Sequence, residues 1–293
     1  MNPASDEEAG FSVSVVGESS DSGRMVIMKT SSEFLSTAIE AASQVGTRLQ
    51  EMLGESRASK GVTTKRNAAD LVTQADRMTE DRIVRLLRER FPNHGVVAEE
   101  GTAHPGGDYR WIIDPIDGTT NFAYGVPLFA VSIALEHKGD LIAGVVYHPS
   151  MDELFAAERG HGAFLRRNGH EKTLRVSDQA TVADSVVATG LPYAIRETGH
   201  NIPEIERLMR TAIEVRIIGT AALNLAYVAA GRMGAFWEPG LNAWDIAAGA
   251  LLVQEAGGRI SDTQGRPFHV DCRNVLATNG RVHNEMVRLL GAA

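Results

Sequence analysis

The stretch that decides the fold of this chain is Trp111-Ile-Ile-Asp-Pro-Ile-Asp-Gly-Thr-Thr-Asn-Phe122. Its apolar beginning, residues 111–113, predicts the end of a buried strand. Pro115 cannot extend a central strand, so we expect the chain to turn at that point. Asp114 and Asp117 would then be held together on a short, stiff corner.

The next three residues, Gly118, Thr119 and Thr120, offer backbone N–H groups and hydroxyls at the start of a helical turn. A helix start of this kind accepts anions. Carboxylates beside it indicate a divalent metal that lies between them and a phosphate. An acidic turn with a helix cap is the simpler interpretation, but it explains only one aspartate and one threonine of the stretch.

The bulk composition is that of an ordinary globular protein. With 293 residues, 43% of them hydrophobic and 23% charged, the chain can form one large domain or two closely joined ones. No stretch approaches the roughly 18 apolar residues of a membrane span, and the beginning lacks the layout of a signal peptide. A single cysteine, Cys272, excludes an internal disulfide and fits a reducing compartment. We therefore expect a cytoplasmic protein that does not bind membranes.

The net charge of −8 is unevenly distributed. Residues 1–24 carry five acidic side chains and one arginine, which accounts for half of the excess. Because this segment is also rich in serine and glycine, we expect residues 1–30 to form a disordered acidic tail. No basic stripe with interleaved aromatic residues occurs in the sequence, so nucleic-acid binding has little support.

Four ordered blocks of sequence resemble the inositol monophosphatase family, the Mg²⁺-dependent, lithium-sensitive sugar phosphatases, and in particular its bacterial inositol-1-monophosphatase branch. The resemblance extends from about residue 31 to the end. The blocks are the stretch quoted above, Asp70-Leu-Val-Thr-Gln-Ala-Asp76, Ala98-Glu-Glu-Gly101, and Trp244-Asp-Ile-Ala-Ala-Gly249 followed by Glu255-Ala-Gly-Gly258.

The family fold implied by this resemblance is a layered α-β-α-β-α sandwich. The sequence pattern agrees with it, because an α+β metal-binding part (31–180) is followed by an alternating α/β substrate-binding part (181–293). A capping box at Thr30-Ser-Ser-Glu33 opens the first helix, which Gly54 ends. Further helices are expected at 76–90, 202–213, 220–230, 243–255 and 282–290, and strands at 96–99, 110–114, 129–136, 141–148, 153–157, 163–165, 186–189, 215–218, 234–238, 259–262 and 274–277.

The resemblance also implies a set of metal ligands. They are the carboxylates of Glu99, Asp114, Asp117 and Asp245 and the backbone carbonyl of Ile116, with Asp114 bridging two ions. All of these are hard oxygen ligands, and the sequence has no histidine and cysteine cluster suited to zinc, so Mg²⁺ is the expected cofactor.

The resemblance assigns the attacking water to Glu99 and Thr119, and it assigns to Asp76 the hydrogen bond from the Thr119 hydroxyl. Asp70 would support this arrangement. Seen alone, Asp76 could equally be a helix cap. Lys65 matches a family lysine on a mobile loop, although an ordinary surface lysine explains it as well.

Glu100 is given no role. Adjacent strand residues face opposite ways, so Glu100 is expected to be the exposed neighbour of Glu99. Residues 164–172 depart from the tighter Asn-Gly turn that is usual in the family, and they are expected to form a longer surface loop.

The expected substrate contacts are Gly118, Thr120, Ala221, Glu238 and Asp245. The backbone N–H groups of Gly118 and Thr119 would hold the phosphate, with the Thr120 hydroxyl nearby. Glu238 lies seven residues before Asp245. At this spacing the resemblance implies an acceptor for ring hydroxyls, with a backbone group at Ala221 as a second ring contact. Pro239, directly after Glu238, departs from the family pattern.

The resemblance favours hydrolysis of inositol 1-phosphate by a water molecule, in a homodimeric enzyme. Histidinol phosphate, fructose 1,6-bisphosphate and a nucleotide 3′-phosphate remain alternative substrates, because the metal chemistry is the same for all of them. A regulatory protein that keeps the fold and acts through partners is an alternative of a different class.

Overall fold

The computed structural model describes residues 31–65, 71–192 and 195–291. Its helices are α1 (Glu33–Leu53), α2 (Gln74–Arg90), α3 (Thr119–Ala123), α4 (Ile195–Thr198), α5 (Ile202–Met209), α6 (Ala221–Ala229), α7 (Ala243–Glu255) and α8 (His283–Gly291). Its strands are β1 (Thr63–Thr64), β2 (Leu71–Val72), β3 (Gly95–Ala98), β4 (Ala103–His104), β5 (Tyr109–Asp117), β6 (Ala130–His137), β7 (Asp140–His148), β8 (Glu153–Glu158), β9 (Gly162–Arg167), β10 (His170–Thr173), β11 (Val186–Thr189), β12 (Glu214–Ile217), β13 (Ala235–Pro239), β14 (Arg259–Ser261) and β15 (Asn274–Thr278).

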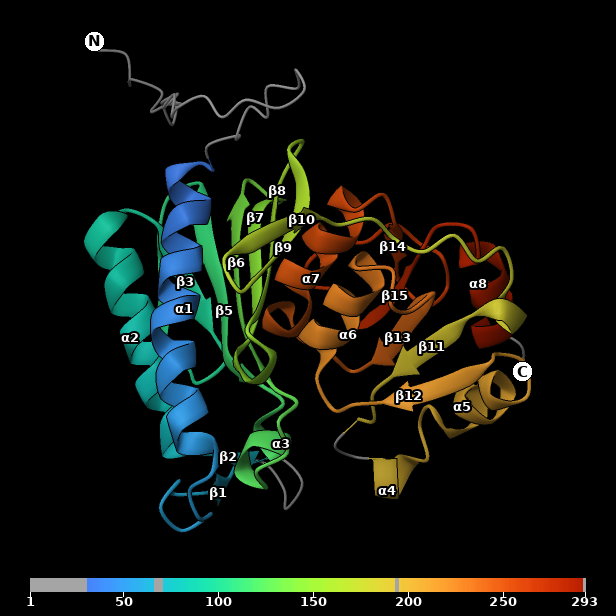
Figure 1. Cartoon of the computed structure of the whole chain (residues 1–293), viewed down its shortest axis with the longest axis horizontal. Helices are drawn as coiled ribbons and strands as arrows, with labels where there is room; N and C mark the ends of the chain where they lie inside the picture. Colours follow the sequence, from blue (N-terminus) through green and yellow to red (C-terminus); the bar gives the residue numbers. More distant parts are fainter. Residues whose placement is uncertain (1–30, 66–70, 193–194, 292–293) are drawn as a thin grey trace.

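Two sheets divide the molecule into five layers. The first sheet has the strand order β10-β9-β8-β7-β6-β5-β3-β4, and the second has the order β12-β11-β13-β15-β14. Helices α1 and α2 cover the outer face of the first sheet, α6 and α7 lie between the sheets, and α5 and α8 lie on the far side (Figure 1). The expected layered α-β-α-β-α sandwich is confirmed.

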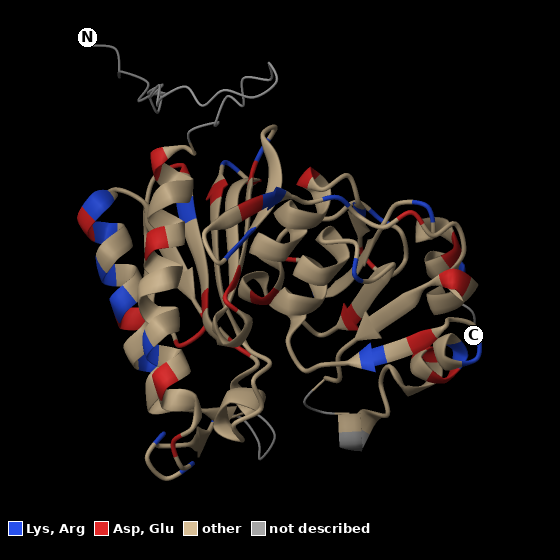
Figure 2. Ribbon diagram, viewed as in Figure 1, with Lys and Arg blue, Asp and Glu red and all other residues tan. Residues whose placement is uncertain are grey.

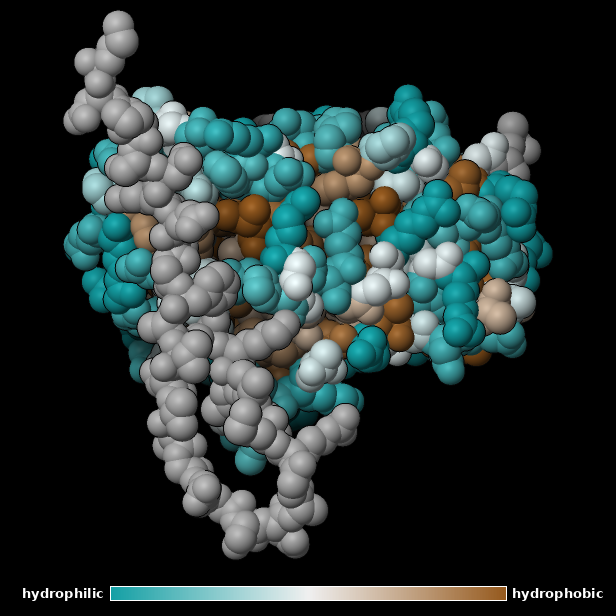
Figure 3. Space-filling view, turned by 90° about the horizontal axis from the view of Figure 1, so that it is seen from above, coloured by the Kyte–Doolittle hydropathy of each residue, from teal (hydrophilic) through white to brown (hydrophobic). Residues whose placement is uncertain are grey.

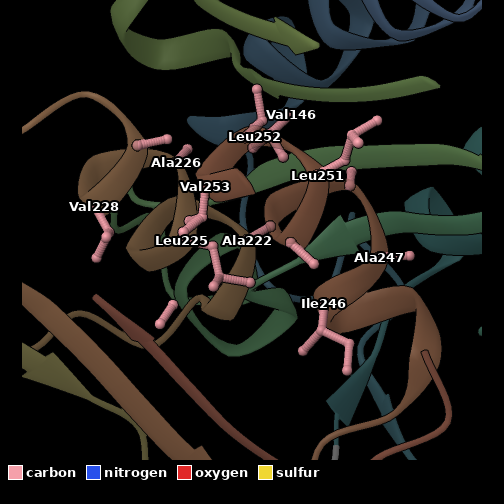
Figure 4. Close-up of a cluster of buried hydrophobic side chains, with 14 of the residues drawn as sticks. Val146, Ala222, Leu225, Ala226, Val228, Ile246, Ala247, Leu251, Leu252 and Val253 are labelled. Atoms are coloured by element: carbon pink, nitrogen blue, oxygen red, sulfur yellow. The ribbon is translucent and has the colours of Figure 1, made fainter. Parts of the chain in front are cut away.

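The central helices are hydrophobic all round because both of their faces are covered by sheets. Side chains of α6 and α7 pack on one another, and Val146 of β7 approaches from the first sheet (Figure 4). Charged residues gather instead on the outer helices α1, α2, α5 and α8 (Figure 2). The end at which α1 begins has a mostly hydrophilic surface, with small hydrophobic groups separated by polar side chains (Figure 3).

The expected order of long helices and strands is confirmed, with ends that shift by a few residues. The cap of α1 is Ser32, whose hydroxyl accepts a hydrogen bond from the Leu35 N–H at 3.2 Å. Thr30, which the sequence suggested for this role, lies outside the described residues, as does the whole segment 1–30. The boundary near residue 180 stays a prediction.

Pro115 does not end its strand, so the expectation of a turn there is wrong. Strand β5 continues to Asp117, with a register shift between Asp114, which pairs with Ser132, and Asp117, which pairs with Ala130. Two residues of β5 therefore stand opposite one residue of β6, which is a β-bulge. The bulge accommodates the proline and brings both aspartates to the same end of the strand.

The expected long loop at 164–172 is also wrong. Strands β9 and β10 form a hairpin in which Arg167 pairs with His170. Only Asn168 and Gly169 make the turn, with φ angles of 50° and 75°. Positive φ at both positions is typical of a type I′ turn, the tight connection that Asn-Gly favours.

None of the described helices combines the length and the apolar composition that a membrane span requires.

Candidate active site

Three aspartates from distant parts of the sequence converge at the junction of the two sheets. Asp114 and Asp117 come from the bulged end of β5, and Asp245 comes from the first turn of α7. One carboxylate oxygen of each aspartate lies within 4.8 Å of the corresponding oxygens of the other two. Asp114 and Asp117 are 1% and 8% exposed, whereas Asp245 is half-buried, so the cluster is shielded from water on the side of β5.

The start of α6 holds Asp117 in place. Its Oδ2 atom accepts hydrogen bonds from the hydroxyl of Thr220, at 2.5 Å, and from the backbone N–H of Ala222, at 2.6 Å. These donors, at the positive end of the helix, favour a charged carboxylate. Ala221 lies in the same turn, and its expected contact with a substrate ring stays a prediction.

Asp245 is held by a capping box at the start of α7. The backbone N–H of Asn242 donates to Asp245 Oδ2 at 2.6 Å, and the side chain of Asn242 caps the same helix. Ser132 pairs with Asp114 across the first sheet, and its hydroxyl donates to the carbonyl of Trp244 at 3.2 Å. The first sheet is thereby linked to the helix that carries Asp245.

The electrostatics of this cluster favour a bound cation. Burial raises the pKa of Asp117 to about 6 and that of Asp245 to about 8, and the neighbouring carboxylates oppose ionisation further. Burial and the charges of Glu99, Asp117 and Asp245 raise the pKa of Asp114 well above its usual value. Within residues 31–65, 71–192 and 195–291, no lysine or arginine forms an ion pair with any of the three aspartates.

The donor set therefore fits a hard divalent cation. It consists of carboxylate oxygens, to which the carbonyl of Ile116 can add, and a cation would relieve the mutual repulsion of the aspartates.

Glu99 and Glu100 follow the end of β3, and both contact Lys65. The Lys65 Nζ atom lies 2.9 Å from Glu99 Oε1 and 2.5 Å from Glu100 Oε1. Although burial lowers the pKa of Lys65, the charges of Glu99 and Glu100 outweigh this effect and raise it. Lys65 is thus no ordinary surface lysine, and it faces the candidate site.

The expectation that Glu100 is exposed is wrong. Its side chain is only 5% exposed, against 18% for Glu99. Strand β3 ends at Ala98, so the alternation of faces no longer applies to the two glutamates. The backbone N–H of Glu100 donates to Glu80 of α2 at 2.7 Å, and its side chain is covered by the contact with Lys65.

Asp76 has both of the roles that the sequence left open. Its Oδ2 atom accepts from the N–H and the hydroxyl of Thr73, at 2.8 and 2.5 Å, in the capping box of α2. Its Oδ1 atom lies 3.0 Å from the Thr119 hydroxyl, which is also 3.0 Å from the carbonyl of Ile116. Burial raises the pKa of Asp76 to about 6. Asp70, the expected support of this arrangement, lies outside the described residues.

Gly118 begins α3 in a conformation that suits glycine. Its φ angle is 92°, and a Cβ atom at this position would lie 3.0 Å from the carbonyl oxygen of Leu128. The side chain of Asn121 then fastens α3 to both halves of the molecule, because it donates to the carbonyls of Leu128 and Ile218 at 2.8 Å each. The contacts of Gly118 and Thr120 with a phosphate stay predictions.

Glu238 lies on β13 and faces the cluster from the second sheet. Burial, together with the charges of Asp245 and Asp117, raises its pKa well above the usual value. No donor in the described part of the chain forms a hydrogen bond with its carboxylate, which packs against Gly190. Pro239 continues β13 by pairing with Asn274, so the departure from the family pattern does not interrupt the strand.

Two further residues of the site, Thr220 and Asn242, are not among those predicted from the sequence. Both precede helices at cap positions, and Asn242-x-x-Asp245 has the spacing of a capping box, which is a local signal. Lys60 was also missed. Its buried Nζ atom donates to the carbonyls of Leu53 and Phe122, at 2.7 and 2.8 Å, and joins α1 to α3.

A five-layer sandwich with clustered carboxylates between a bulged strand and two central helices defines a class, the metal-dependent phosphatases. The profile of the inositol monophosphatase family matches residues 30–292, and the chain belongs to this family.

Individual relatives agree with this assignment. An inositol-1-monophosphatase of Mesorhizobium japonicum is 44% identical over 260 residues, which are 88% of this chain and 96% of that protein. A Nus factor SuhB of Pseudomonas aeruginosa is 45% identical over 223 residues, 73% of this chain and 80% of that protein. The crystal structure of the extragenic suppressor protein suhB of Bartonella henselae superimposes with a TM-score of 0.84 and 41% identity, covering 89% of this chain and 100% of the other. The chain is therefore a phosphatase of the hydrolase class.

Proposed function

We propose that this phosphatase hydrolyses inositol 1-phosphate to inositol and phosphate, with Mg²⁺ as its cofactor. The observation that carries the proposal is the convergence of Asp114, Asp117 and Asp245 within 4.8 Å, beside Glu238, whose pKa is raised by burial and by the charges of Asp245 and Asp117. The first three are ligands for a hard cation, and the fourth is an acceptor placed for hydroxyl groups. The name of the Mesorhizobium relative supports the choice of substrate.

The residues that would hold Mg²⁺ are Glu99, Asp114, Asp117, Asp245 and the carbonyl of Ile116. When bound, divalent cations neutralise the phosphoryl group and make water a stronger nucleophile at neutral pH. We further propose that residues 31–180 supply most of these ligands and that residues 181–293 supply most substrate contacts. Asp245 is the exception, because it is a ligand from the second part.

The chain itself orients the attacking water through Thr119. The hydroxyl of Thr119 has one proton, which it donates to Asp76 or to the carbonyl of Ile116, both 3.0 Å away. Its lone pairs are then free to accept a hydrogen bond from water. Glu99 is the group that would take the water proton as a general base.

Phosphate and ring are recognised by different groups. The first N–H groups of α3, at Gly118 and Thr119, have no partner within their helix and would donate to phosphate oxygens, with the Thr120 hydroxyl beside them. Glu238 would accept hydrogen bonds from ring hydroxyls. Because no donor in the described part of the chain forms a hydrogen bond with its carboxylate, which packs against Gly190, a polyol would supply the donors that this largely desolvated group needs.

A panel of substrates tests this proposal. Phosphate release is measured with inositol 1-phosphate, histidinol phosphate, fructose 1,6-bisphosphate and adenosine 3′,5′-bisphosphate, each with Mg²⁺, and then with added Li⁺. We expect inositol 1-phosphate to have the highest kcat/KM and Li⁺ to inhibit. If another ester has the highest kcat/KM, the proposed role of Glu238 is wrong, while the proposed metal site stands.

We also propose that the protein is a cytoplasmic homodimer. Leu191, Ile202, Met209, Ile213 and Ile217 are between 42% and 67% exposed and lie within one segment that includes α5 and β12. Strand β12 is an edge strand, and such an edge invites pairing with another chain. Light scattering of wild-type protein and of Ile217→Arg tests this proposal. We expect the wild type to be dimeric and the variant to be monomeric. A wild type that is monomeric, like the variant, would overturn the dimer.

A partner-binding role is a second candidate, because a relative at 45% identity is named a Nus factor. Asp245→Asn separates the two functions. If wild type and variant capture a partner equally, and the wild type shows no Mg²⁺-dependent turnover, the result would support a partner-binding role in place of catalysis.

A further inference from the structure

A buried asparagine outside the candidate active site completes a closed network of hydrogen bonds. Asn201, which precedes α5, is 2% exposed and has a positive φ angle of 76°. Its Oδ1 atom accepts from Trp237 Nε1 at 2.7 Å. Its Nδ2 atom donates to Thr189 Oγ1 at 2.9 Å and to the carbonyl of Gly190 at 2.8 Å. All three hydrogen bonds are made inside the protein, where a lost partner is costly.

The network closes through Thr189. Its hydroxyl accepts from Asn201 and donates to the carbonyl of Trp237 at 2.6 Å. Thr189 and Trp237 are register partners on the parallel strands β11 and β13, and they are 0% and 1% exposed. The side chain of Asn201 therefore joins two neighbouring inner strands of the second sheet, at the last residue of β11 and the middle residue of β13.

The chemistry of each position matches this arrangement. An indole N–H only donates, so the amide oxygen of Asn201 must face Trp237 and the amide nitrogen must face the two acceptors. Aspartate could accept from Trp237 but could not donate to Gly190. Asparagine also tolerates a positive φ angle better than most residues do.

The network acts on Glu238 through its neighbours. Gly190 follows Thr189, and Glu238 follows Trp237. A Cβ atom at position 190 would collide with the carboxylate of Glu238, so the backbone of Gly190 forms one wall against that carboxylate. No hydrogen bond within the described residues holds the Glu238 carboxylate, so its place depends on this wall and on the end of β13. Asn201 fixes both, because it binds the carbonyl of Gly190 and the side chain of Trp237.

We propose that Asn201 is a positioning residue for substrate specificity, which holds Gly190 and β13 so that Glu238 meets the ring hydroxyls of a polyol phosphate. The inference rests on the proposed function of Glu238. Asn201 forms no hydrogen bond with Asp114, Asp117 or Asp245. Its loss therefore weakens recognition of the polyol and leaves hydrolysis of a phosphate ester without ring hydroxyls nearly unchanged.

The test compares inositol 1-phosphate with p-nitrophenyl phosphate in the full-length protein with Mg²⁺. For Asn201→Ala we expect KM for inositol 1-phosphate to rise about tenfold, which is the effect of losing one or two buried hydrogen bonds. Both kinetic constants for the aryl ester should change less than about twofold. Asn168→Ala is the matched control, because Asn168 also has a positive φ angle but lies in the β9–β10 turn. Its selectivity should equal that of wild type.

A second pair of variants covers the case in which Asn201→Ala does not fold. Thr189→Val removes the hydroxyl at nearly constant volume, whereas Thr189→Ser keeps it. We expect Thr189→Val to reproduce the loss of selectivity and Thr189→Ser to retain most of it. Equal selectivity in the two variants would overturn the proposal.

A double-mutant cycle distinguishes positioning from general destabilisation. If Asn201 acts through Glu238, adding Asn201→Ala to Glu238→Gln should lower selectivity no further. An equal fold-loss in both backgrounds would show that Asn201 does not act through Glu238, and the proposal would be overturned while the proposed function stands. If Glu238→Gln itself leaves selectivity unchanged, the role of Glu238 and this inference both fail.

Discussion

Thr220 Oγ1 donates a hydrogen bond to Asp117 Oδ2 at 2.5 Å, across 103 residues of sequence. Because the backbone N–H of Ala222 donates to the same oxygen, both lone pairs of Asp117 Oδ2 are committed to the start of α6, and Oδ1 is left for a cation. The second half of the chain thus orients a ligand that the first half supplies. A partner of this kind tunes metal affinity without touching the metal.

We therefore expect Thr220→Val to raise the Mg²⁺ concentration for half-maximal activity about tenfold or more, within the range for outer partners of metal ligands. Thr220→Ser keeps the hydroxyl and should stay close to wild type. The measurement is initial rate against Mg²⁺ concentration at saturating substrate. The same Mg²⁺ dependence in both variants would contradict the role of this bond.

Asp114→Asn should abolish turnover and leave the fold intact. The variant removes one of three crowded carboxylates, and in the metal-free protein burial and the charges of its neighbours raise the pKa of Asp114. The thermal midpoint in EDTA should therefore rise or stay unchanged, while Mg²⁺ should stabilise wild type and not the variant. Asp140→Asn, at an exposed ion pair with Arg159, is the control. Normal activity of Asp114→Asn would remove the basis for the metal site.

Thr119→Ala should lower kcat about a hundredfold, because the water loses the acceptor that orients it towards the phosphate. KM should change little, since the backbone N–H groups of α3 remain. Thr119→Ser keeps a hydroxyl between Asp76 and the carbonyl of Ile116, so it should recover most of kcat. A serine variant as slow as the alanine variant would argue that the threonine methyl group, and not its hydroxyl, is what matters.

Glu238→Gln should lower kcat/KM for inositol 1-phosphate about tenfold and that for p-nitrophenyl phosphate much less. The lost interaction is a hydrogen bond from a ring hydroxyl to a carboxyl oxygen in a largely desolvated site, and such a bond is worth about 0.5–1.5 kcal/mol. Equal losses on the two esters would mean that Glu238 serves hydrolysis in general, not recognition of the polyol.

The stability of the protein should depend on pH through His283, which is fully buried between the hydroxyls of Ser261 and Thr278 at 2.9 Å each. Burial, with the nearby charge of Arg259, lowers its pKa from 6.5 to about 4. Between these values the unfolded chain binds a proton that the folded protein does not. The free energy of unfolding therefore falls as pH falls from about 6.5 to about 4, by up to about 3 kcal/mol.

Urea unfolding of wild type and His283→Gln at several pH values checks this, because contributions of other groups cancel in the difference. The stability advantage of wild type should shrink between neutral pH and pH 4. A difference that does not vary with pH would show that folding leaves the pKa of His283 unchanged, as for an exposed imidazole.

Local patterns in the sequence were sufficient to predict most helices and strands, because strand alternation and helix caps depend on neighbouring residues. They were not sufficient at Pro115, where pairing with β6 through a bulge overrides the tendency of proline to end a strand. They also failed at Glu100, whose burial depends on Glu80 and Lys65, both of which are distant in sequence.

The candidate site shows the same division. The aspartates could be named from their motifs, and the structure brings three of them together. The contacts that hold the aspartates could not be predicted from the sequence, because Thr220 reaches Asp117 only after α6 packs between the sheets. Asn201 is further still from any motif, and only the fold places it beside Gly190 and Trp237.

The most direct test of the metal-dependent mechanism is phosphate release from inositol 1-phosphate by protein treated with EDTA, before and after Mg²⁺ is restored. The structure predicts no turnover without the metal, full recovery on adding Mg²⁺, and no recovery in Asp114→Asn. Undiminished turnover in EDTA, or recovery of the variant to the wild-type rate, would contradict the assignment of the aspartate cluster as the metal site.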